Sequence, residues 1–487
     1  MNNYKIICIN QKHSVKLHFQ NKKPSMKNYL LIIFPLLVFS VNSSSQGVFQ
    51  RVLGNVGIGY DIIESSDHNF IFTGLAGGGE QVIVSKIDSA GDTIWVKYFG
   101  PTIGNTPSNV GHSITYISND RYLITGNYDP GINADYSNLY AIIIDSAGNE
   151  IWENNYGNGT CGGNNAVYDS INKKIYFVGY VNSTSVLLIK TDTAGNFIWS
   201  KTYTYGSQSV GIKIAMRNDT DIFIVGYMSV TGNNTDGILL EVDSAGTVIN
   251  MKHFGGNLND EFNDLRILPD SGFMVAGRTI NNLSHWDGWL LRFDKNLDTL
   301  WSKVYSQDSF SCSFNHFTFS SSNTYWICGF SSNYITTIEY AWICETDTIG
   351  NVLYNGLYGT NQYNSLASII ESTNHSILAI GDASGAYLVR LDSDYLYNGI
   401  NENLLSEKIV TYPNPSNGII YLKVPENINF KELQINIVDV LAKKYSVNYS
   451  QLKNNLISVS LPFANGLYIL TLQDKKHVFQ NKIILQK

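Results

Sequence analysis

A short strand that ends in glycine recurs seven times in the 487-residue chain, and this repeat constrains the fold more than any other feature. The glycines are spaced 47 to 53 residues apart, at Gly74, Gly126, Gly179, Gly226, Gly277, Gly329 and Gly381. A second alternating strand follows each glycine and ends at an aspartate: Asp88, Asp145, Asp192, Asp243, Asp294, Asp347 or Asp392. Four of these aspartates open the sequence Asp-Ser/Thr-Ala-Gly, which favours a tight hairpin turn with a left-handed glycine.

Two further strands complete each repeat. The strand after the turn usually carries a tryptophan, at Trp95, Trp152, Trp199 and Trp301, with Ile249 and Tyr354 in its place in two weaker copies. Another strand lies before the glycine strand. Its residue thirteen positions before the glycine is Asp61, Ser113, Ala166, Lys213, Asp264, His316 or Ser368, and the residue that follows is always apolar. Four short strands per repeat in meander order predict one blade of a β-propeller.

The seventh repeat lacks its tryptophan-type strand, and the segment 48–54 near the N-terminus matches that missing strand. An unpaired strand edge would remain if the ring were not joined in this way. We therefore predict an all-β fold in which residues 46–397 form a seven-bladed β-propeller, with the last blade completed by the N-terminal strand.

The N-terminal segment has the pattern of an export signal. Met26 and Lys27 precede an apolar run at 29–39, and small polar residues follow up to Ser45. This run is too short to span a bilayer, which favours a cleaved signal peptide at 26–45. Residues 1–25 fit no export pattern, so we expect translation to start at Met26.

A polar linker at 398–407 separates the repeats from a different module at 408–487. The module has alternating strands with turns every 8 to 12 residues, which predict a small immunoglobulin-like β-sandwich. Its most distinctive residues are Tyr412, Pro413, Asn414, Pro415 and Gly418 at the opening, and Gly466, Leu467 and Tyr468 in a later strand.

This module resembles the C-terminal sorting domain of type IX secretion, and the repeats resemble propeller repeats of secreted Bacteroidetes proteins. The resemblance implies export by the general pathway, then passage across the outer membrane through the type IX machinery, with the protein released or held at the cell surface. An ordinary adhesion-type sandwich is the alternative reading of the module.

Charge is distributed unevenly along the chain. The segments 1–45 and 406–487 carry +6 and +5, so the net charge of -7 leaves -18 for the body between them. An acidic body argues against a nucleic-acid partner. A content of 44% hydrophobic and 15% charged residues excludes a mostly disordered chain.

The cysteines show no metal-ligand spacing. Cys161, Cys312, Cys328 and Cys344 contain no Cys-x-x-Cys pair and no Cys/His pattern, so we expect no zinc. Cys328 and Cys344 either form a disulfide or are two buried thiols; the sequence leaves both open.

No catalytic motif is present, and we assign no catalytic residue, cofactor or metal from the sequence. The repeated tryptophans are expected in the core, and the aspartates in turns. Asp236 and Asp287 are expected to cap loops. If the position shared by Asp61, Lys213 and His316 lines the central channel, it forms a polar lining there.

Loop length varies mainly between the second and third strands of each repeat, and these loops open on one rim of the predicted ring, which we call the variable rim. Binding residues concentrate on such loops. The candidate ligand-binding residues are Tyr128, Asp129, Asp135, Tyr136, Asn233, Asn234, His285, Trp286, Tyr334 and Tyr340. A monomeric module that binds glycan or protein is the first functional hypothesis. A polysaccharide lyase or glycoside hydrolase that uses the channel, and a structural surface component, are the alternatives.

Overall fold

The computed structural model describes residues 48–392 and 410–485, with internal gaps. The gaps are 55, 79–80, 101–108, 129–136, 158, 231–233, 308–309, 334–336, 360–361, 413–415, 417, 424–432, 440–442, 446, 448, 454–455, 462 and 474–477. The predicted extension 1–25, signal peptide 26–45 and linker 398–407 lie outside the described residues. Within those residues, no helix is long and apolar enough to cross a membrane.

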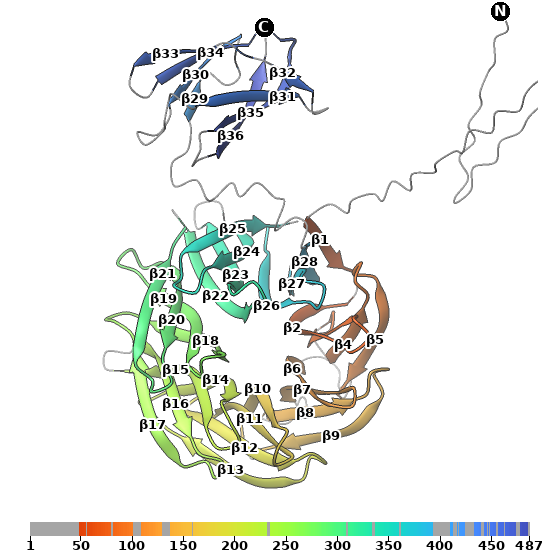
Figure 1. The fold of residues 1–487 in the computed structure, drawn as a ribbon. Helices are drawn as coiled ribbons and strands as arrows, with labels where there is room; N and C mark the ends of the chain where they lie inside the picture. Colours follow the sequence, from red (N-terminus) through yellow and green to blue (C-terminus); the bar gives the residue numbers. More distant parts are fainter. Residues whose placement is uncertain are drawn as a thin grey trace, which may run out of the picture. The chain divides into compact units, whose positions relative to one another are not determined.

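Seven four-stranded antiparallel sheets are arranged around a central space (Figure 1), and we number them sheets 1 to 7 in chain order. Sheets 1 to 3 contain β2 (Ile58–Glu64), β3 (Phe70–Leu75), β4 (Val82–Ile87) and β5 (Thr93–Phe99); β6 (Val110–Ser118), β7 (Arg121–Tyr128), β8 (Asn138–Ile144) and β9 (Glu150–Tyr156); and β10 (Cys161–Asp169), β11 (Lys174–Val181), β12 (Ser185–Asp192) and β13 (Phe197–Tyr203). Sheets 4 and 5 contain β14 (Ser209–Met216), β15 (Ile222–Ser229), β16 (Thr235–Val242) and β17 (Val248–Phe254); and β18 (Asp260–Ile267), β19 (Phe273–Ile280), β20 (Trp286–Phe293) and β21 (Thr299–Tyr305). Sheet 6 contains β22 (Phe310–Phe319), β23 (Tyr325–Asn333), β24 (Ile338–Thr346) and β25 (Val352–Tyr358).

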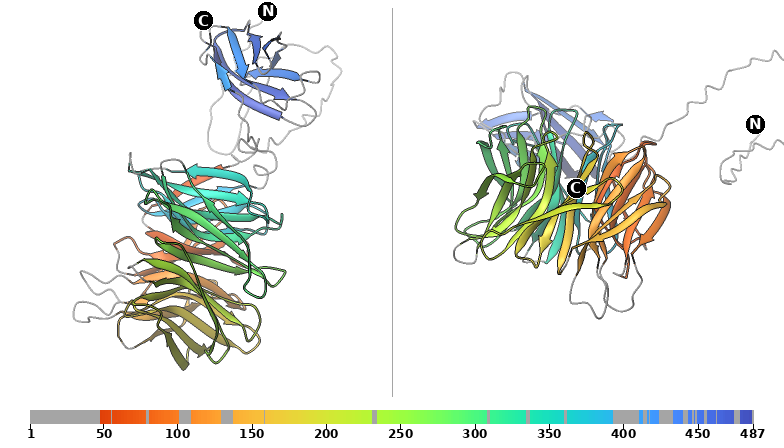
Figure 2. Two further views of the ribbon diagram at one scale, coloured as in Figure 1. Left: turned by 90° about the vertical axis from the view of Figure 1, so that its left-hand side faces the viewer. Right: turned by 90° about the horizontal axis from the view of Figure 1, so that it is seen from below.

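Sheet 7 is built from both ends of this region, as the sequence predicts. Its strands are β26 (Ser365–Glu371), β27 (Ile377–Asp382), β28 (Ala386–Leu391) and, paired antiparallel to β28, the N-terminal strand β1 (Val48–Leu53). The innermost strand of sheet 1, β2, packs against β26 and β27 of sheet 7, so the last sheet meets the first. Two further views show the sheets edge-on (Figure 2).

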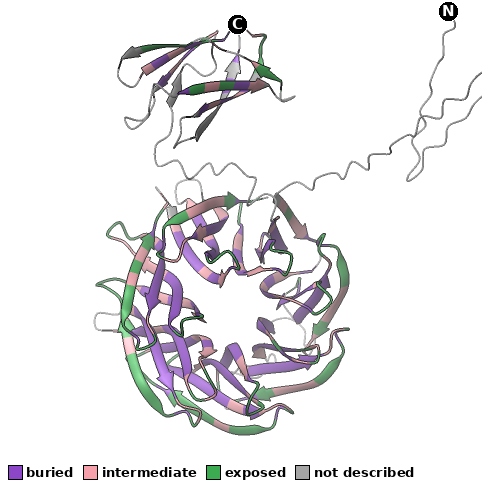
Figure 3. Ribbon diagram, in the orientation of Figure 1, coloured by how far each residue is buried: buried purple, intermediate pink, exposed green. Residues whose placement is uncertain are grey.

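A separate hydrophobic cluster fills each seam, by which we mean the contact between two neighbouring sheets. The described residues contain seven such clusters for the seven seams. The second and third strands are almost wholly buried, whereas the outermost strands are largely exposed (Figure 3). Burial of apolar area in these clusters, at about 25 cal/mol per Å², holds each sheet to its neighbours.

The recurring tryptophan and the turn glycine belong to one seam contact. Ring carbons of Trp95 lie 3.0 Å from the point where a Cβ on Gly148 of the next sheet would stand, and Trp152 lies 3.2 Å from that point on Gly195. Trp199 contacts Gly246, and Trp301 contacts Gly350, in the same way. These turn glycines all have φ between 78° and 80°. The glycine therefore permits the left-handed turn, and its lack of a side chain leaves room for the neighbouring indole.

The same contact closes the ring. Phe49 of β1 pairs with Arg390, as each tryptophan pairs with the residue two before its turn aspartate. Its ring lies 2.9 Å from the Cβ point of Gly91 in sheet 1. Arg51 of β1 adds an ion pair of 2.7 Å to Asp92 in the same turn.

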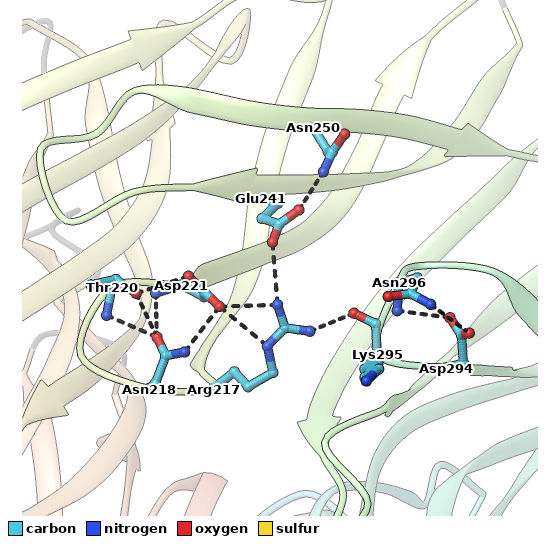
Figure 4. Close-up of polar contacts among 9 residues, drawn as sticks. All are labelled: Arg217, Asn218, Thr220, Asp221, Glu241, Asn250, Asp294, Lys295 and Asn296. Atoms are coloured by element: carbon cyan, nitrogen blue, oxygen red, sulfur yellow. Dashed lines mark hydrogen bonds and ion pairs between the residues drawn. The ribbon is translucent and has the colours of Figure 1, made fainter.

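The seam between sheets 4 and 5 is built differently from these five. Between sheets 4 and 5, Glu241 pairs with Asn250, so Asn250 occupies the tryptophan position and the sequence-based placement of Ile249 there is wrong. The turn of sheet 5 has Leu297 in place of glycine, with φ of 69° and a side chain only 3% exposed. The side chain of Leu297 thus extends from the turn into the space that an indole occupies at other seams. Polar contacts reinforce this seam (Figure 4): Arg217 donates to the carbonyl of Lys295 at 2.6 Å.

The C-terminal module forms two four-stranded sheets that share one hydrophobic cluster. One sheet has the order β29 (Val410–Tyr412), β30 (Ile419–Lys423), β34 (Leu456–Ser460), β33 (Tyr449–Lys453). The other has the order β32 (Lys444–Tyr445), β31 (Gln434–Asp439), β35 (Gly466–Gln473), β36 (Val478–Leu485). Residues 413–415 of the opening motif lie outside the described residues; Tyr468 is buried and its hydroxyl donates to the carbonyl of Ala464 at 2.9 Å.

The four cysteines of the described region are free thiols, and the disulfide alternative for Cys328 and Cys344 is wrong. Cys328 stands opposite Ile343 and Cys344 opposite Ile327 on adjacent strands. The two thiols are therefore one position out of register and point to opposite faces of sheet 6, because side chains alternate along a strand. Cys328 packs into the seam with sheet 7, and Cys344 into the seam with sheet 5.

Candidate functional site: the central cavity

Every innermost strand contains a β-bulge at the same place. The pairing of β2 with β3 skips from Gly59 to Asp61, which leaves Tyr60 as the extra residue. The other six innermost strands skip one residue in the same way, at His112, Asn164, Ile212, Asn263, Asn315 and Ala367. A bulge re-aims a side chain out of the regular alternation of the strand. The seven sheets therefore supply seven re-aimed residues.

The repeated glycine of the second strand is the counterpart of this bulge. A Cβ on Gly74 would lie 1.8 Å from the carbonyl oxygen of Ile58, and a Cβ on Gly126 would lie 1.7 Å from that of Val110. The glycines of the other five sheets meet an innermost-strand carbonyl oxygen at 1.8 to 2.0 Å. Only glycine permits this approach of two backbones. The repeated glycine of the sequence is thus a consequence of the close approach between the first and second strands of each sheet.

The bulged residues line a central cavity of about 620 Å³. Five of the residues that directly follow the bulges line it as well: Asp61, Ser113, Asn165, Lys213 and His316. Tyr180, Ser183, Tyr227 and Ser365 complete much of the wall. The bulges lie near the starts of the innermost strands, and Tyr180 and Ser183 lie where β11 leads into the loop to β12. Both places are on the variable rim, so the cavity opens toward the variable loops.

The position after the bulge forms a polar belt, which we define as Asp61, Ser113, Asn165, Lys213, Asp264, His316 and Ser368. Sequence counting placed Ala166 in this set. The register shows instead that Asn165 is equivalent, because it pairs with the residue before Gly179 as Asp61 pairs with the residue before Gly74. The third repeat has one extra residue in its first hairpin, which shifts the count by one.

Side chains of the belt and of the bulges connect neighbouring sheets. Asp61 accepts a hydrogen bond from the backbone N–H of Ile114 at 2.9 Å and from the hydroxyl of Ser368 at 2.7 Å. Asn164 donates to the carbonyl of Gly211 at 2.7 Å. Asn263 and Asn315 donate in the same way, each at 2.8 Å, to carbonyls of the next innermost strand. The polar lining therefore holds the ring together as well as facing the cavity.

A buried carboxylate anchors the belt on one side. Asp264 is fully buried and accepts the N–H of Phe317 at 3.0 Å. Lys213 lies 3.3 Å from its Oδ1, and Arg266 lies 3.8 Å from its Oδ2. Burial alone would raise the pKa of Asp264, but His316, Lys213, Arg266 and this hydrogen bond outweigh it, so the pKa is lowered. The carboxylate is a structural anion whose charge the adjacent cations Lys213 and Arg266 compensate.

Tyr60 and His112 form an aromatic pair in the cavity wall, with ring centroids 5.6 Å apart. Burial lowers the pKa of His112 to about 4. Burial, followed by the charge of Asp382, raises the pKa of Tyr60. Both side chains are therefore uncharged at neutral pH, and the pair presents a neutral imidazole next to a protonated phenol.

The candidate rim residues that the structure describes are not among the residues that line the cavity. Asp129, Asp135, Tyr136, Asn233 and Tyr334 lie outside the described residues. Tyr128 ends β7 and stacks on Tyr140, with ring centroids 6.4 Å apart. Asn234 donates to the carbonyl of Asn257 at 2.5 Å.

The remaining rim residues lie on or next to strands. Trp286 begins β20 instead of lying in a loop, and the guanidinium of Arg278 lies 4.2 Å from the centre of its ring. His285 precedes it, and Tyr340 lies within β24, where it is half-buried. Sequence reasoning did not identify the bulged residues, although each stands at a nearly constant spacing before the repeated glycine.

One cluster has the residue types of a catalytic triad without its geometry. Ser321 Oγ lies 2.9 Å from Nδ1 of His375, and Glu371 Oε1 lies 3.2 Å from the same nitrogen. A triad needs the hydroxyl and the carboxylate on different ring nitrogens. Thr373 and His68 repeat the arrangement at the next seam, which marks it as a contact between sheets. In the described part of the chain, no group of three or more His, Cys, Asp or Glu residues could hold a metal ion.

Fold and cavity together define a class: an all-β protein of repeated four-stranded sheets, the β-propeller class, with a polar central cavity. Residues 410–486 match the family model described as secretion system C-terminal sorting domain. This tail indicates export to the cell surface or into the medium, and interaction with the type IX secretion machinery. No curated protein sequence matches the chain at a significant level.

Several solved structures are similar to this chain. The WD40 β-propeller domain of Doa1 is 12% identical with a TM-score of 0.47, over 70% of this chain and 95% of that one. The extracellular domain of BT3049 from B. thetaiotaomicron, described as a hybrid two-component system, is 12% identical with a TM-score of 0.47, over 90% of this chain and 57% of that one. A structure of YCF48 bound to a D1 peptide is 11% identical with a TM-score of 0.41, over 72% of this chain and 98% of that one.

Proposed function

We propose that this is an exported binding protein: a seven-bladed β-propeller that takes its ligand at the cavity mouth on the variable rim. The single observation that carries the proposal is the cavity of about 620 Å³, lined by a re-aimed residue from every sheet. Ligand sites are concave and largely preformed, and a cavity of this size is within their usual range. The ring provides a rigid support for such a site.

The chemistry of the wall favours an uncharged, polyhydroxylated ligand such as a glycan. Ten of the seventeen lining residues carry an amide, a hydroxyl or a phenol, groups that can both donate and accept hydrogen bonds. The two charged groups of the wall are already engaged: Asp61 with three donors, and Lys213 with Asp264. Tyr60, Tyr180 and Tyr227 offer aromatic surface for the apolar faces of sugar rings.

The variable loops would extend this site at its mouth. Trp286, His285, Tyr128, Asn234 and Tyr340 lie on or near that rim. Tyrosine, asparagine and tryptophan supply adaptable contacts in recognition surfaces. The rim residues would then determine which extended glycan or protein partner fits over the cavity.

An enzymatic role is the second candidate, because Tyr60 and His112 converge in the cavity wall, as a lyase or hydrolase in the channel would require. Their protonation states weaken it. A general base is most effective when its pKa is near the working pH, and His112, with a pKa of about 4, is a weak base. The buried Asp264 is committed to the belt cations, so it is not available as a second carboxylate.

The tail supports a matching path of export. We propose that residues 26–45 are a signal peptide, that translation starts at Met26, and that 408–487 is an immunoglobulin-like sorting domain recognised by the type IX machinery. The propeller 46–397 is expected to act as a monomer outside the cell. Its net charge of -17 disfavours a nucleic-acid partner.

A glycan array with the secreted protein tests the binding proposal, followed by titration of each hit. Ala367 is the smallest bulged residue of the wall, so Ala367→Trp is expected to fill the cavity and reduce affinity at least about tenfold. Ile198→Trp, on the exposed outer strand β13, is the matched control and should bind like wild type.

The outcome separates the hypotheses. If Trp286→Ala abolishes binding while Ala367→Trp does not, the rim alone binds and the cavity proposal is wrong. Release of unsaturated or shortened sugars from a hit, with loss of this release in His112→Phe, would instead favour the enzyme. Absence of any binding would leave a structural surface component.

A further inference from the structure

Two buried aspartates meet in the seam between sheets 4 and 5, on the variable rim and away from the central cavity. Asp236 is 5% exposed and Asp260 is 3% exposed. Asp236 is the second residue of β16, and Asp260 is the first residue of β18. Two carboxylates in one buried place repel each other unless a proton or a cation lies between them.

The two carboxylates converge on one small space. A Cβ on Gly255 would stand 2.5 Å from Oδ1 of Asp236 and 2.6 Å from Oδ2 of Asp260, so the two oxygens are separated by no more than the sum of these distances. Any side chain at position 255 would occupy that space. Gly255 and Gly256 are themselves exposed, so the space is close to solvent.

One of these oxygens has no partner. Oδ1 of Asp236 is buried and makes no hydrogen bond among the described residues. The other oxygen, Oδ2, lies 2.6 Å from Nδ1 of His253, which fixes the orientation of the carboxyl group. Oδ2 of Asp260 accepts the backbone N–H of Gly256 at 2.7 Å. Ordinarily a buried carboxylate oxygen has a partner, and its absence costs about 1–3 kcal/mol or more.

The internal repeat supplies a control for the pair of acids. Asp287, at the equivalent position of the next seam, also has a buried Oδ1 without a described partner, so the second carboxylate is what distinguishes this seam. The same two positions, seven before the turn aspartate and seventeen before the second-strand glycine (eighteen in sheet 3), meet at other seams. They hold Gln81 and Asn109, Asn138 and Cys161, Ser185 and Ser209, Asp287 and Cys312, and Tyr340 and Asn364. None of these pairs has two acids. The fold therefore tolerates neutral residues here, and the double acid at one seam calls for a specific reason.

Charges around the pair do not supply that reason. Glu261 is adjacent, and its own ion pair is with Arg278 at 2.6 Å. Burial raises the pKa of Asp260, and the charges of Asp236 and Glu261 raise it further. Hydrogen bonds from Thr279 and Gly256 oppose this rise. His253 contacts only the outer oxygen of Asp236, and its side chain is 52% exposed.

We propose that Asp236 and Asp260 bind one hard divalent cation, calcium in the extracellular setting, with backbone oxygens and water completing its shell. Calcium takes six to eight oxygen ligands in flexible geometry, and carboxylates that are themselves hydrogen-bonded are its usual protein ligands. The ion would join β16 to β18 and thereby sheet 4 to sheet 5. This site is independent of the proposed ligand in the central cavity.

Thermal unfolding of the full secreted chain tests the site, after treatment with EDTA and with or without about 5 mM calcium. Calcium sites of extracellular modules have dissociation constants of roughly 0.1 to 1 mM, so the ratio of folded to unfolded protein should rise roughly 6- to 50-fold. Asp260→Asn should abolish this response. Asparagine already occupies the equivalent position at Asn109 and Asn364, so the variant is expected to fold. The matched control is Asp287→Asn at the next seam, which should retain the calcium response.

The stabilities of wild type and Asp260→Asn in EDTA provide a second test, because calcium should reverse their order. Without calcium, Asp260→Asn removes a repulsion and should be more stable than wild type; with calcium, the order should reverse. Sensitised terbium luminescence should appear in wild type and Asp287→Asn but not in Asp260→Asn. The proposal is wrong if no protein responds to calcium, or if Asp260→Asn responds like wild type. A wild-type protein that ignores calcium but is stabilised when the pH falls toward 4 would show that the pair shares a proton instead.

Discussion

Leu297 offers the sharpest test of how the seams are built. In five seams an aromatic ring lies against a turn glycine, whereas at the seam of sheets 4 and 5 the turn itself supplies Leu297 and the facing strand supplies Asn250. Replacement of Leu297 by glycine removes a side chain that is 3% exposed and packs with the seam cluster. Loss of a buried leucine side chain costs about 3–5 kcal/mol, including the cavity that remains.

A second term opposes this loss. Leu297 has φ of 69°, a left-handed conformation that costs a non-glycine residue about 1–2 kcal/mol and costs glycine almost nothing. Leu297→Gly should therefore lower the free energy of unfolding by about 2–3 kcal/mol. Leu297→Ala retains the strained φ and also loses most of the side chain, so its loss should be larger, about 3–4 kcal/mol.

A second substitution should rescue the first. Asn250→Trp alone should destabilise the protein, because the new indole meets the side chain of Leu297. Combined with Leu297→Gly, it recreates the contact seen between Trp199 and Gly246, and the double variant should regain at least about 1 kcal/mol relative to the sum of the single changes. Urea unfolding of the four proteins measures this coupling. Additive effects, or a Leu297→Gly variant more stable than Leu297→Ala by less than the measurement error, would refute the reasoning.

The remaining predictions address closure, pH, thiols and export. Phe49→Ala removes the half-buried ring that seals sheet 7 to sheet 1 and should cost about 1–3 kcal/mol, measured by urea unfolding, whereas the same change at exposed Phe197 should cost less than about 0.5 kcal/mol. His112 has a folded pKa of about 4 against an unfolded value of about 6.5, so its stabilising contribution is complete above pH 6.5 and is lost as the pH falls toward 4, by about 1–3 kcal/mol; His112→Asn should flatten the stability profile in that window, and an unchanged profile would contradict the assignment. Reducing agent should leave the melting temperature unchanged, and alkylation of the unfolded protein without reductant should label both Cys328 and Cys344. Deletion of 410–486 should abolish surface localisation or release while leaving the repeats folded, as fractionation and limited proteolysis would show; export equal to that of the full chain would count against the sorting role.

The architecture was predictable because the repeat has local physical causes. The second-strand glycine recurs since a Cβ there would collide with the carbonyl oxygen of the innermost strand, and the turn glycine recurs since an indole covers it. Closure by residues 48–53 followed from the absence of one strand pattern in the seventh repeat. These features act through backbone geometry, so they leave a fixed spacing in the sequence.

The details of the site were less predictable because they depend on register. Because the first hairpin of sheet 3 has one extra residue, the belt position is held by Asn165 and not by Ala166. Cys328 and Cys344 are one position out of register, so they cannot form the disulfide that the sequence left open. The bulge that aims Tyr60 and its six equivalents into the cavity inserts one residue without any change in residue type. Its trace in the sequence is the neighbouring glycine, which pattern analysis alone reads as the end of a strand.

The pairing of β1 with β28 joins residues 333 to 343 positions apart, whereas most other strand pairs in the sheets are joined by short turns. Closing a loop of that length costs roughly 3 kcal/mol more than closing a hairpin of about ten residues. We therefore expect sheet 7 to be completed last during folding, so that β28 has a free edge until β1 pairs with it. A strand from another molecule with the sequence of β1 would fit the same edge. A ring that lacks β1 should accept a synthetic peptide of residues 46–54 as a donated strand, and two full-length chains that exchange their first strands should form a dimer without any new interface.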